Sequence, residues 1–115
     1  MSVVGFVLAG VLVAVAFMAM RLLGRVKPAE ARALVDRGAM LVDLQPRAGF
    51  GAAHIPRARN IPLAELPRRL KELGNKDRPL VVYGVGQSTN AEATRILRAA
   101  GFTRVHDLGP MSRWG

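Results

Sequence analysis

The stretch Leu80-Val81-Val82-Tyr83-Gly84-Val85-Gly86-Gln87-Ser88-Thr89-Asn90 joins an apolar run to a Gly-rich turn and then to a helical pattern. Residues 80–83 have the continuous apolar character of a strand buried on both faces of a parallel sheet. Residues 90–100 place apolar side chains on one helical face. We therefore expect a strand, a loop over residues 84–89 and a helix, a shape that presents backbone N–H groups to an anion.

The flanking sequence alternates helical and strand patterns in the same way. Before this stretch we expect a helix over 28–37, a strand over 39–43, a loop over 45–58 and an extended piece over 59–61. Residues 62–73 should form two short helices, or one helix that starts at Pro67. After the stretch we expect a last strand over 102–106. Strands that alternate with helices indicate an α/β fold, a small parallel sheet with helices on both faces. Such a sheet binds ligands beyond the carboxyl ends of its strands, where Gly84 and Asp43 both fall.

The first quarter of the chain differs in kind from the rest. Residues 3–20 contain no charged and no strongly polar side chain. With Leu22 and Leu23 added, a helix rising roughly 1.5 Å per residue reaches about the 30 Å of a hydrocarbon core. A core helix that is apolar on every face would need burial all round, and the remaining residues are too few to surround it. We expect one transmembrane helix in a membrane anchor, residues 1–25, followed by one domain, residues 26–115.

The residues on either side of the apolar segment bear on two questions: whether the segment is cleaved, and in which direction it crosses the membrane. A cleaved signal peptide is the competing interpretation, because Ala14-Val15-Ala16 has the small residues of a cleavage site. Against it, Met1-Ser2 carries no basic residue and the apolar run continues past that site. The basic residues Arg21, Arg25 and Lys27 lie on the C-terminal side, which the positive-inside rule assigns to the cytoplasm. The sequence predicts an uncleaved, single-pass membrane protein with a cytoplasmic domain.

Composition narrows the class of partner. The chain has 17 Lys and Arg against 8 Asp and Glu, a net charge of +9, which beside a membrane favours contact with anionic headgroups. Nucleic acid is not expected, because the basic residues are scattered and only one Tyr and one Trp accompany them. The chain has no cysteine, and this excludes disulfides, thiolate catalysis and thiolate metal sites together.

Several short motifs follow one another along residues 26–115. In order they are Leu41-Val42-Asp43-Leu44, Phe50, Ala53-His54-Ile55-Pro56-Arg57-Ala58, Asn60-Ile61-Pro62-Leu63, the strand, loop and helix over 81–100, Gly101-Phe102, and Leu108-Gly109 through Trp114. Together these pieces resemble the rhodanese family. His-Ile-Pro followed by Asn-Ile-Pro-Leu is the more specific part of the pattern. The resemblance implies an α/β fold, which agrees with the alternation of elements.

For active members, the resemblance implies sulfur transfer through a loop cysteine that becomes a persulfide, with loop amides and an arginine stabilising the charges. In this chain the cysteine position is Gly84, the next arginine position is Val85 and the later arginine or threonine position is Thr89. The arginine that follows the strand's aspartate is replaced by Gln45. Glycine cannot carry a persulfide, and no other residue of the chain can replace it. We therefore expect a protein that is not an enzyme.

The degenerate loop and three polar residues remain as a candidate site. The loop keeps glycines and hydroxyl groups at a helix N-terminus, which gives either a weak anion site or a plain helix cap by Ser88, Thr89 or Asn90. Its residues are Gly84, Val85, Gly86, Gln87, Ser88 and Thr89. We expect three residues to flank the pocket: Asp43, accepting backbone N–H groups of its neighbouring loop, Gln45, and His54, making a structural hydrogen bond. With no cysteine and His106 as the one other histidine, no metal and no cofactor is expected.

The expected function is a membrane-anchored, non-catalytic rhodanese-like binding or scaffold module. It would hold a protein partner through the former active-site pocket or through a basic surface. The basic residues considered for that surface are Arg57, Arg59, Arg68, Arg69, Lys71, Lys76 and Arg78. Two alternatives stay open. One is a small-oxyanion sensor that uses the loop 84–89, and the other is a partner-assisted sulfur-transfer component in which this domain supplies only the oxyanion cradle.

Overall fold

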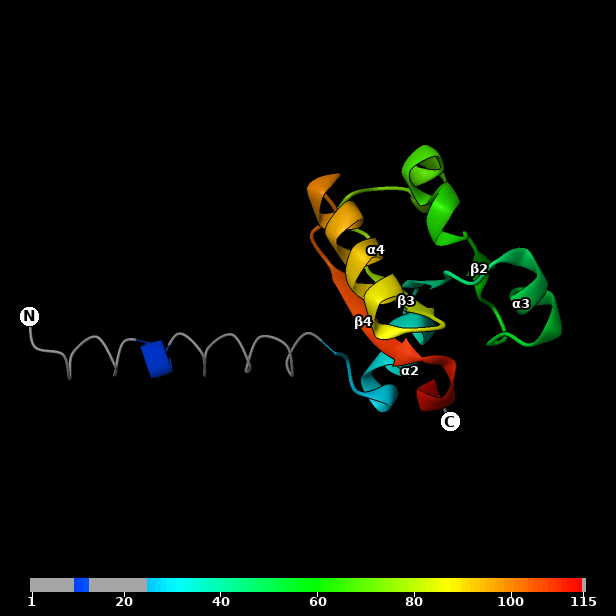
Figure 1. The fold of residues 1–115 in the computed structure, drawn as a ribbon, viewed down its shortest axis with the longest axis horizontal. Helices are drawn as coiled ribbons and strands as arrows, with labels where there is room; N and C mark the ends of the chain where they lie inside the picture. The colour runs from blue at the N-terminus through cyan, green and yellow to red at the C-terminus, as the bar shows by residue number, and fades with distance from the viewer. Residues whose placement is uncertain (1–9, 13–24, 115) are drawn as a thin grey trace, which may run out of the picture.

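The computed structural model of the chain describes residues 10–12 and 25–114. Parallel strands alternate with helices from residue 28 onward (Figure 1). The elements are α2 (Pro28–Asp36), β1 (Met40–Asp43), α3 (Arg47–Ala52), β2 (Arg59–Asn60), the 3-10 helices η1 (Leu63–Arg68) and η2 (Leu70–Leu73), β3 (Leu80–Gly84), α4 (Gln87–Ala99), β4 (Val105–Pro110) and the 3-10 helix η3 (Met111–Trp114). The α/β fold class expected from the sequence is confirmed.

One four-stranded parallel sheet, in the order β2-β1-β3-β4, separates two apolar layers. Because successive side chains of a strand point to opposite faces, neighbours such as Val81 and Val82 of β3 belong to different layers. The layer of Val82 lies under α4, η1 and η2, and the layer of Val81 lies under α2 and η3. Helices thus cover both faces, and the carboxyl ends of β1 and β3 meet at one edge of the sheet.

The domain begins along the outer edge of β4. The Val26 N–H donates to the Asp107 carbonyl at 2.9 Å, and Arg25 pairs with Asp107 as an isolated parallel bridge. Among the residues that the structure describes, no helix has the length and apolar character needed to cross a membrane. The anchor expected over residues 1–25 lies outside the described residues, apart from residues 10–12 and Arg25, and stays a prediction.

Three element boundaries differ from the sequence-based expectation. The loop expected over 45–58 contains helix α3, in which the Phe50 N–H donates to the Pro46 carbonyl at 3.1 Å. Pro46 therefore precedes a helix, a position that a residue without an N–H tolerates well. Helix α4 begins at Gln87 instead of Asn90, and the last strand runs over Val105–Pro110 instead of 102–106. Residues 62–73 form two short helices, one of the two expected arrangements, with Pro67 inside the first.

The buried hydroxyl of Tyr83 links the sheet to the loop before β2. It accepts a hydrogen bond from the Ile55 N–H at 3.0 Å, and both residues are buried. Burial, together with the neighbouring Asp43 carboxylate, raises the pKa of Tyr83 well above its usual range. The hydroxyl thus stays protonated and satisfies a backbone donor that water cannot reach.

We expect Tyr83→Phe to lower the free energy of unfolding by about 1–3 kcal/mol, because the Ile55 N–H then remains buried without an acceptor. Urea unfolding of the full chain in detergent micelles measures this loss. Thr103→Val is the control, since the exposed Thr103 hydroxyl makes only a 3.4 Å contact with the Lys76 carbonyl. An equal effect of the two substitutions would contradict the assigned role of the Tyr83 hydroxyl.

Candidate functional site

The turn after β3 is shorter than the expected six-residue loop. Strand β3 runs through Gly84 and α4 starts at Gln87, so that only Val85 and Gly86 lie between them. Gly86 is the N-cap residue of α4, and no side chain makes a capping hydrogen bond. The expectation of a cap by Ser88, Thr89 or Asn90 is therefore wrong. Because α4 begins three residues early, these side chains belong to its first turn.

The space beside Gly84 is filled by its neighbours. A Cβ atom added to this buried glycine would lie 2.9 Å from Oδ1 of Asn90, 3.3 Å from Cβ of Leu44 and 3.3 Å from Cγ2 of Thr89. Two of these contacts come from α4 and one from the turn after β1. Because a packed interior yields little to an added atom, the position that the resemblance assigns to the nucleophile has no room for a side chain.

Hydrogen bonds to β4 hold Asn90 in this space. Its Nδ2 donates to Oδ1 of Asp107 and to the Gly109 carbonyl, both at 2.9 Å. The Asn90 side chain is buried, and within the described residues its Oδ1 has no hydrogen-bond partner. Since both Nδ2 hydrogens point to acceptors, the amide cannot reverse to satisfy Oδ1. Asn90 thus fastens α4 to β4 and turns its carbonyl oxygen toward Gly84.

Four side chains of the expected six-residue loop line two separate surfaces. Val85 and Thr89 line a groove beside Leu44 and η1. Gln87 and Ser88 line a separate hollow next to Arg25 at the β4 edge. An oxyanion site needs several donors directed at one point. The structure separates the side chains of these residues between two surfaces.

The groove beside Val85 is apolar. We call it the apolar groove; it encloses about 720 Å³ and is lined by Leu44, Pro46, Arg47, Pro62, Leu63, Ala64, Glu65, Arg68, Val85 and Thr89. Within the described residues 25–114, Val85 is the one large apolar side chain that is exposed, at 71%. The resemblance to the rhodanese family places an arginine at this position, where it would attract anions. In this chain the position belongs to an apolar surface.

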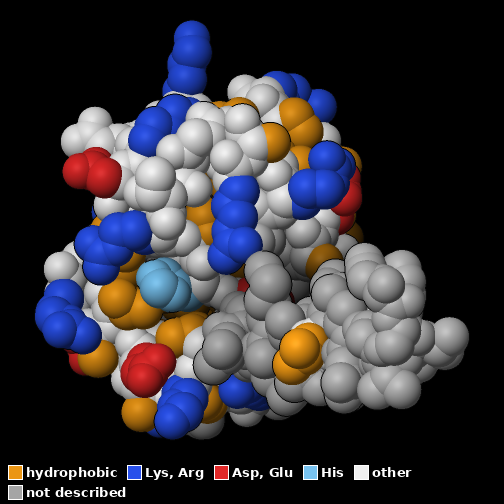
Figure 2. All heavy atoms as spheres, turned by 90° about the vertical axis from the view of Figure 1, so that its left-hand side faces the viewer, with side chains coloured by type: hydrophobic (Ala, Val, Ile, Leu, Met, Phe, Trp, Pro, Cys, Tyr) orange, Lys and Arg blue, Asp and Glu red, His pale blue; other side chains and the backbone are white. Residues whose placement is uncertain are grey.

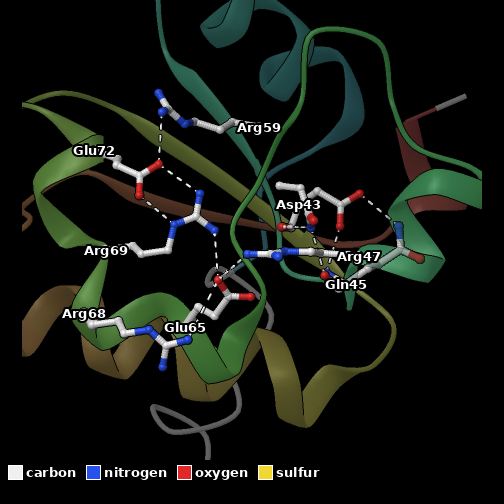
Figure 3. A network of polar contacts seen from close by, with 9 residues as sticks. Asp43, Gln45, Arg47, Arg59, Glu65, Arg68, Arg69 and Glu72 are labelled. Atoms are coloured by element: carbon white, nitrogen blue, oxygen red, sulfur yellow. Dashed lines mark hydrogen bonds and ion pairs between the residues drawn. The ribbon is translucent and has the colours of Figure 1, made fainter.

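Arginine residues surround the single carboxylate of this groove. Glu65 lies 3.0 Å from Arg47, 3.3 Å from Arg69 and 3.9 Å from Arg68. Figure 3 shows these side chains meeting at Glu65. The Arg47 and Arg68 side chains are 76% and 73% exposed, against 17% for Glu65. The rim therefore presents positive charge to solvent.

A second carboxylate, Glu72, extends this network. It accepts from Arg69 at 2.6 Å and from Arg59 at 3.0 Å, and these bonds lower the pKa of Glu72. Arg57 pairs with Asp36 at 3.0 Å. Four of the seven residues considered for a basic partner surface are thus ion-paired within the domain. Spacing along the sequence does not reveal such pairing between separate elements.

Asp43 and Gln45 form a buried support for the turn after β1. The Asp43 carboxylate accepts from the Gln45 backbone N–H at 2.8 Å and from Gln45 Nε2 at 2.9 Å. Asn60 Nδ2 donates to the carbonyls of both residues, at 3.1 Å and 2.8 Å. The expectation that Asp43 accepts a backbone N–H is confirmed. Asn60 was not recognised as part of this network from the sequence, although the Asn-Ile-Pro-Leu motif contains it.

His54 has a structural environment. Its Nδ1 lies 2.8 Å from the Phe50 carbonyl, and its ring stacks on the Phe50 ring with centroids 3.8 Å apart. The expected structural hydrogen bond is therefore confirmed. In the described part of the chain, no three His, Cys, Asp or Glu side chains gather where a metal ion could be held.

Fold and site define a small α/β domain with a degenerate loop at the carboxyl end of its third strand. The family model for the rhodanese-like domain matches residues 27–114. The chain belongs to the rhodanese-like family. It lacks the cysteine on which the family's sulfurtransferase chemistry depends.

Curated relatives include the uncharacterized protein YqhL of Bacillus subtilis, 35% identical over 80 residues that span 69% of this chain and 63% of YqhL. Thiosulfate sulfurtransferase GlpE of Pseudomonas syringae is 30% identical over 91 residues, 78% of this chain and 85% of GlpE. The HTH-type transcriptional regulator Rv0324 of Mycobacterium tuberculosis is 48% identical over 63 residues, 53% of this chain and 27% of that protein. The match thus spans less than two thirds of YqhL and of Rv0324.

Solved structures share the fold. The human single-domain sulfurtransferase TSTD1 superposes with a TM-score of 0.71 at 28% identity, covering 78% of this chain and 93% of that one. The rhodanese-like domain of the Anabaena protein Alr3790 gives a TM-score of 0.69 at 26% identity, covering 78% of this chain and 71% of that one. These likenesses support the family assignment over most of the described domain.

We expect Gly84→Ala to destabilise the domain by about 1–3 kcal/mol, because the new methyl group displaces Asn90. Gly51→Ala is the matched control, since a Cβ at Gly51 has no neighbour within 4 Å. Urea unfolding measures this loss of stability.

We also expect Gly84→Cys to transfer no sulfur from thiosulfate to cyanide, because the added thiol meets the same obstruction. A thiocyanate assay measures the transfer. Turnover by Gly84→Cys would show that the site is open.

Proposed function

We propose that this chain is a membrane-anchored, non-catalytic rhodanese-like module that binds a protein partner in the apolar groove. One observation carries the proposal. Where an active relative needs a nucleophile, Asn90 fills the space beside Gly84, and the adjoining surface is an apolar groove with Val85 71% exposed. Exposed apolar surface in a concave site favours binding of another apolar group.

The groove indicates the chemistry of the partner segment. Apolar lining residues such as Leu44, Pro62 and Leu63 suit an aliphatic or aromatic side chain. The exposed Arg47 and Arg68 at the rim share the single carboxylate of Glu65. An acidic residue next to the apolar one would therefore complement the rim. The proposed partner is a protein that presents such a segment close to the membrane.

The two alternatives from the sequence have less support. A small-oxyanion sensor and a partner-assisted sulfur-transfer component both require an intact cradle at residues 84–89. Only Val85 and Gly86 lie between β3 and α4, and Val85 carries no charge where the resemblance places an arginine. The relationship to a thiosulfate sulfurtransferase fits a domain that has kept its fold while losing this chemistry.

Membrane anchoring and the cytoplasmic position are part of the proposal. The uncharged residues 3–20 have the length of a transmembrane helix, and Arg21, Arg25 and Lys27 follow them. An anchor would confine the domain to the membrane surface, where a weak groove contact is strengthened by high local concentration.

Photocrosslinking tests the groove. With p-benzoylphenylalanine at Val85 in the full chain, we expect one discrete protein adduct in native membranes. Thr89→Lys should abolish the adduct, because a charge then enters the apolar groove. The matched control is Ser88→Lys, the same change one residue earlier, where the side chain lines the other hollow. Equal adducts in both variants, or no adduct at Val85, would contradict partner binding at this groove.

Cysteine labelling tests the orientation. The chain has no native cysteine. A single Asn75→Cys substitution in the exposed turn before β3 therefore reports on which side of the membrane residue 75 lies. We expect an impermeant thiol reagent to leave it unlabelled in intact cells and to label it after lysis. Ser2→Cys, expected on the opposite side, should react in intact cells. The reverse pattern would overturn the cytoplasmic assignment.

A further inference from the structure

The junction between the apolar segment and the domain fixes one edge of the sheet near the membrane. This inference rests on the proposed anchor. Arg25 is bridged to Asp107 on the outer edge of β4, and Val26 donates to the Asp107 carbonyl. Arg25 is two residues beyond Leu23, so even a fully extended chain separates their Cα atoms by only about 7 Å. With the proposed anchor, the part of β4 beside Arg25 lies within about one Debye length, 8 Å, of the end of the apolar segment.

Cations gather at this edge. Arg25 and Arg98 line one hollow, which Arg95, Gln87, Ser88 and Asp107 also line. Burial, together with the nearby charges of Arg104 and Arg98, lowers the pKa of His106 in β4. Arg25 and Arg113 both lie beside Gly109, since a Cβ added there would be 3.4 Å from an Arg113 guanidinium nitrogen and 4.0 Å from Arg25 Cζ. We call this set the basic edge: Arg25, Arg98, Arg104 and Arg113, together with the exposed Lys27, which follows Val26 in the chain.

Few acidic groups oppose these charges. Glu30 lies close enough to act on His106, and the half-buried Asp107 lines the same hollow as Arg25 and Arg98. Its carboxylate accepts hydrogen bonds from Asn90 Nδ2 and from the Gly109 N–H. Arg95 is paired with Glu92. Among the described residues, no member of the basic edge lies within ion-pair distance of a carboxylate. The opposite edge differs, since Arg57 and Arg59 beside β2 are both ion-paired.

The space-filling view shows the same face. Figure 2 looks at the side of Figure 1 on which α4 and β4 lie, and Lys and Arg side chains are spread over it with few Asp or Glu between them. The hollow at this face encloses about 940 Å³ and runs along α4 from Gln87 to Arg98. Unpaired guanidinium groups and an open hollow suit phosphate groups, which arginine binds with two N–H donors at once.

We propose that the basic edge docks against the anionic phospholipid headgroups of the membrane that holds the anchor. Docking sets the orientation of the domain, because β4 then faces the bilayer and β2, the opposite edge of the sheet, faces away. The apolar groove lies between the turns after β1 and β3 and η1. It contains no residue of the basic edge, so the partner site stays accessible while the domain lies on the membrane.

Paramagnetic broadening in lipid nanodiscs tests the orientation. The full chain is placed in phosphatidylcholine with or without phosphatidylglycerol, and a headgroup spin label broadens nearby amide signals. We expect strong broadening at Arg98 and Arg104, little at Arg59 and Asn60, and an increase at the first pair when phosphatidylglycerol is present. Raised salt should reverse that increase.

Charge reversal supplies the matched control. In Arg98→Glu/Arg104→Glu the lipid-dependent broadening should fall at least roughly fivefold, since each basic residue near an anionic surface contributes about 1 kcal/mol. Arg57→Glu/Arg59→Glu makes the same charge change at the opposite edge and should leave the broadening unchanged. If the chain inserts but the amide signals of both edges are broadened equally, the proposed orientation is wrong. The basic edge would then be a binding surface for an acidic protein instead of lipid. A chain that does not enter the nanodisc overturns the proposed anchor together with the orientation.

Discussion

The contact between Asn90 and Gly84 is the constraint on which the rest of the structure depends. Asn90 reaches from α4 to β4 through two hydrogen bonds, and its carbonyl oxygen stands 2.9 Å from the place of a Gly84 Cβ. A side chain at residue 84 and this arrangement of Asn90 exclude each other. The glycine therefore does more than omit a nucleophile, because it permits α4 to pack against the end of β3.

Two surfaces of the domain differ in their chemistry. Replacement of a family arginine by Val85 makes the mouth of the former site apolar, and the arginines that remain at its rim share Glu65. In the basic edge no side chain is ion-paired with a carboxylate of the described residues, and Asp107, which lines the same hollow, accepts from Asn90 and Gly109. Asn90 thus links both surfaces. It fills the space beside Gly84 on one side and donates a hydrogen bond to Asp107 on the other.

The fold could be predicted because its signals are local. The apolar run of β3 and the helical pattern of α4 are read directly from residue types. The site could be predicted only in part. The role of Asp43 followed from its position after a strand, whereas the orphaned Oδ1 of Asn90 and the pairing of Arg59 with Glu72 depend on contacts between distant elements. The early start of α4 was missed because Gln87, Ser88 and Thr89 are polar and carry no helical periodicity.

The measurement that tests the closed site most directly is an amide NMR titration of the full chain in micelles with thiosulfate. Its informative signals are the backbone amides of Gly84, Val85 and Gly86, which would line the cradle of an active relative. With Asn90 against Gly84 and no charge at Val85, we predict no saturable shift of these three signals at millimolar thiosulfate. Saturable shifts confined to them would contradict the account, because the cradle would then bind its anion without the nucleophile.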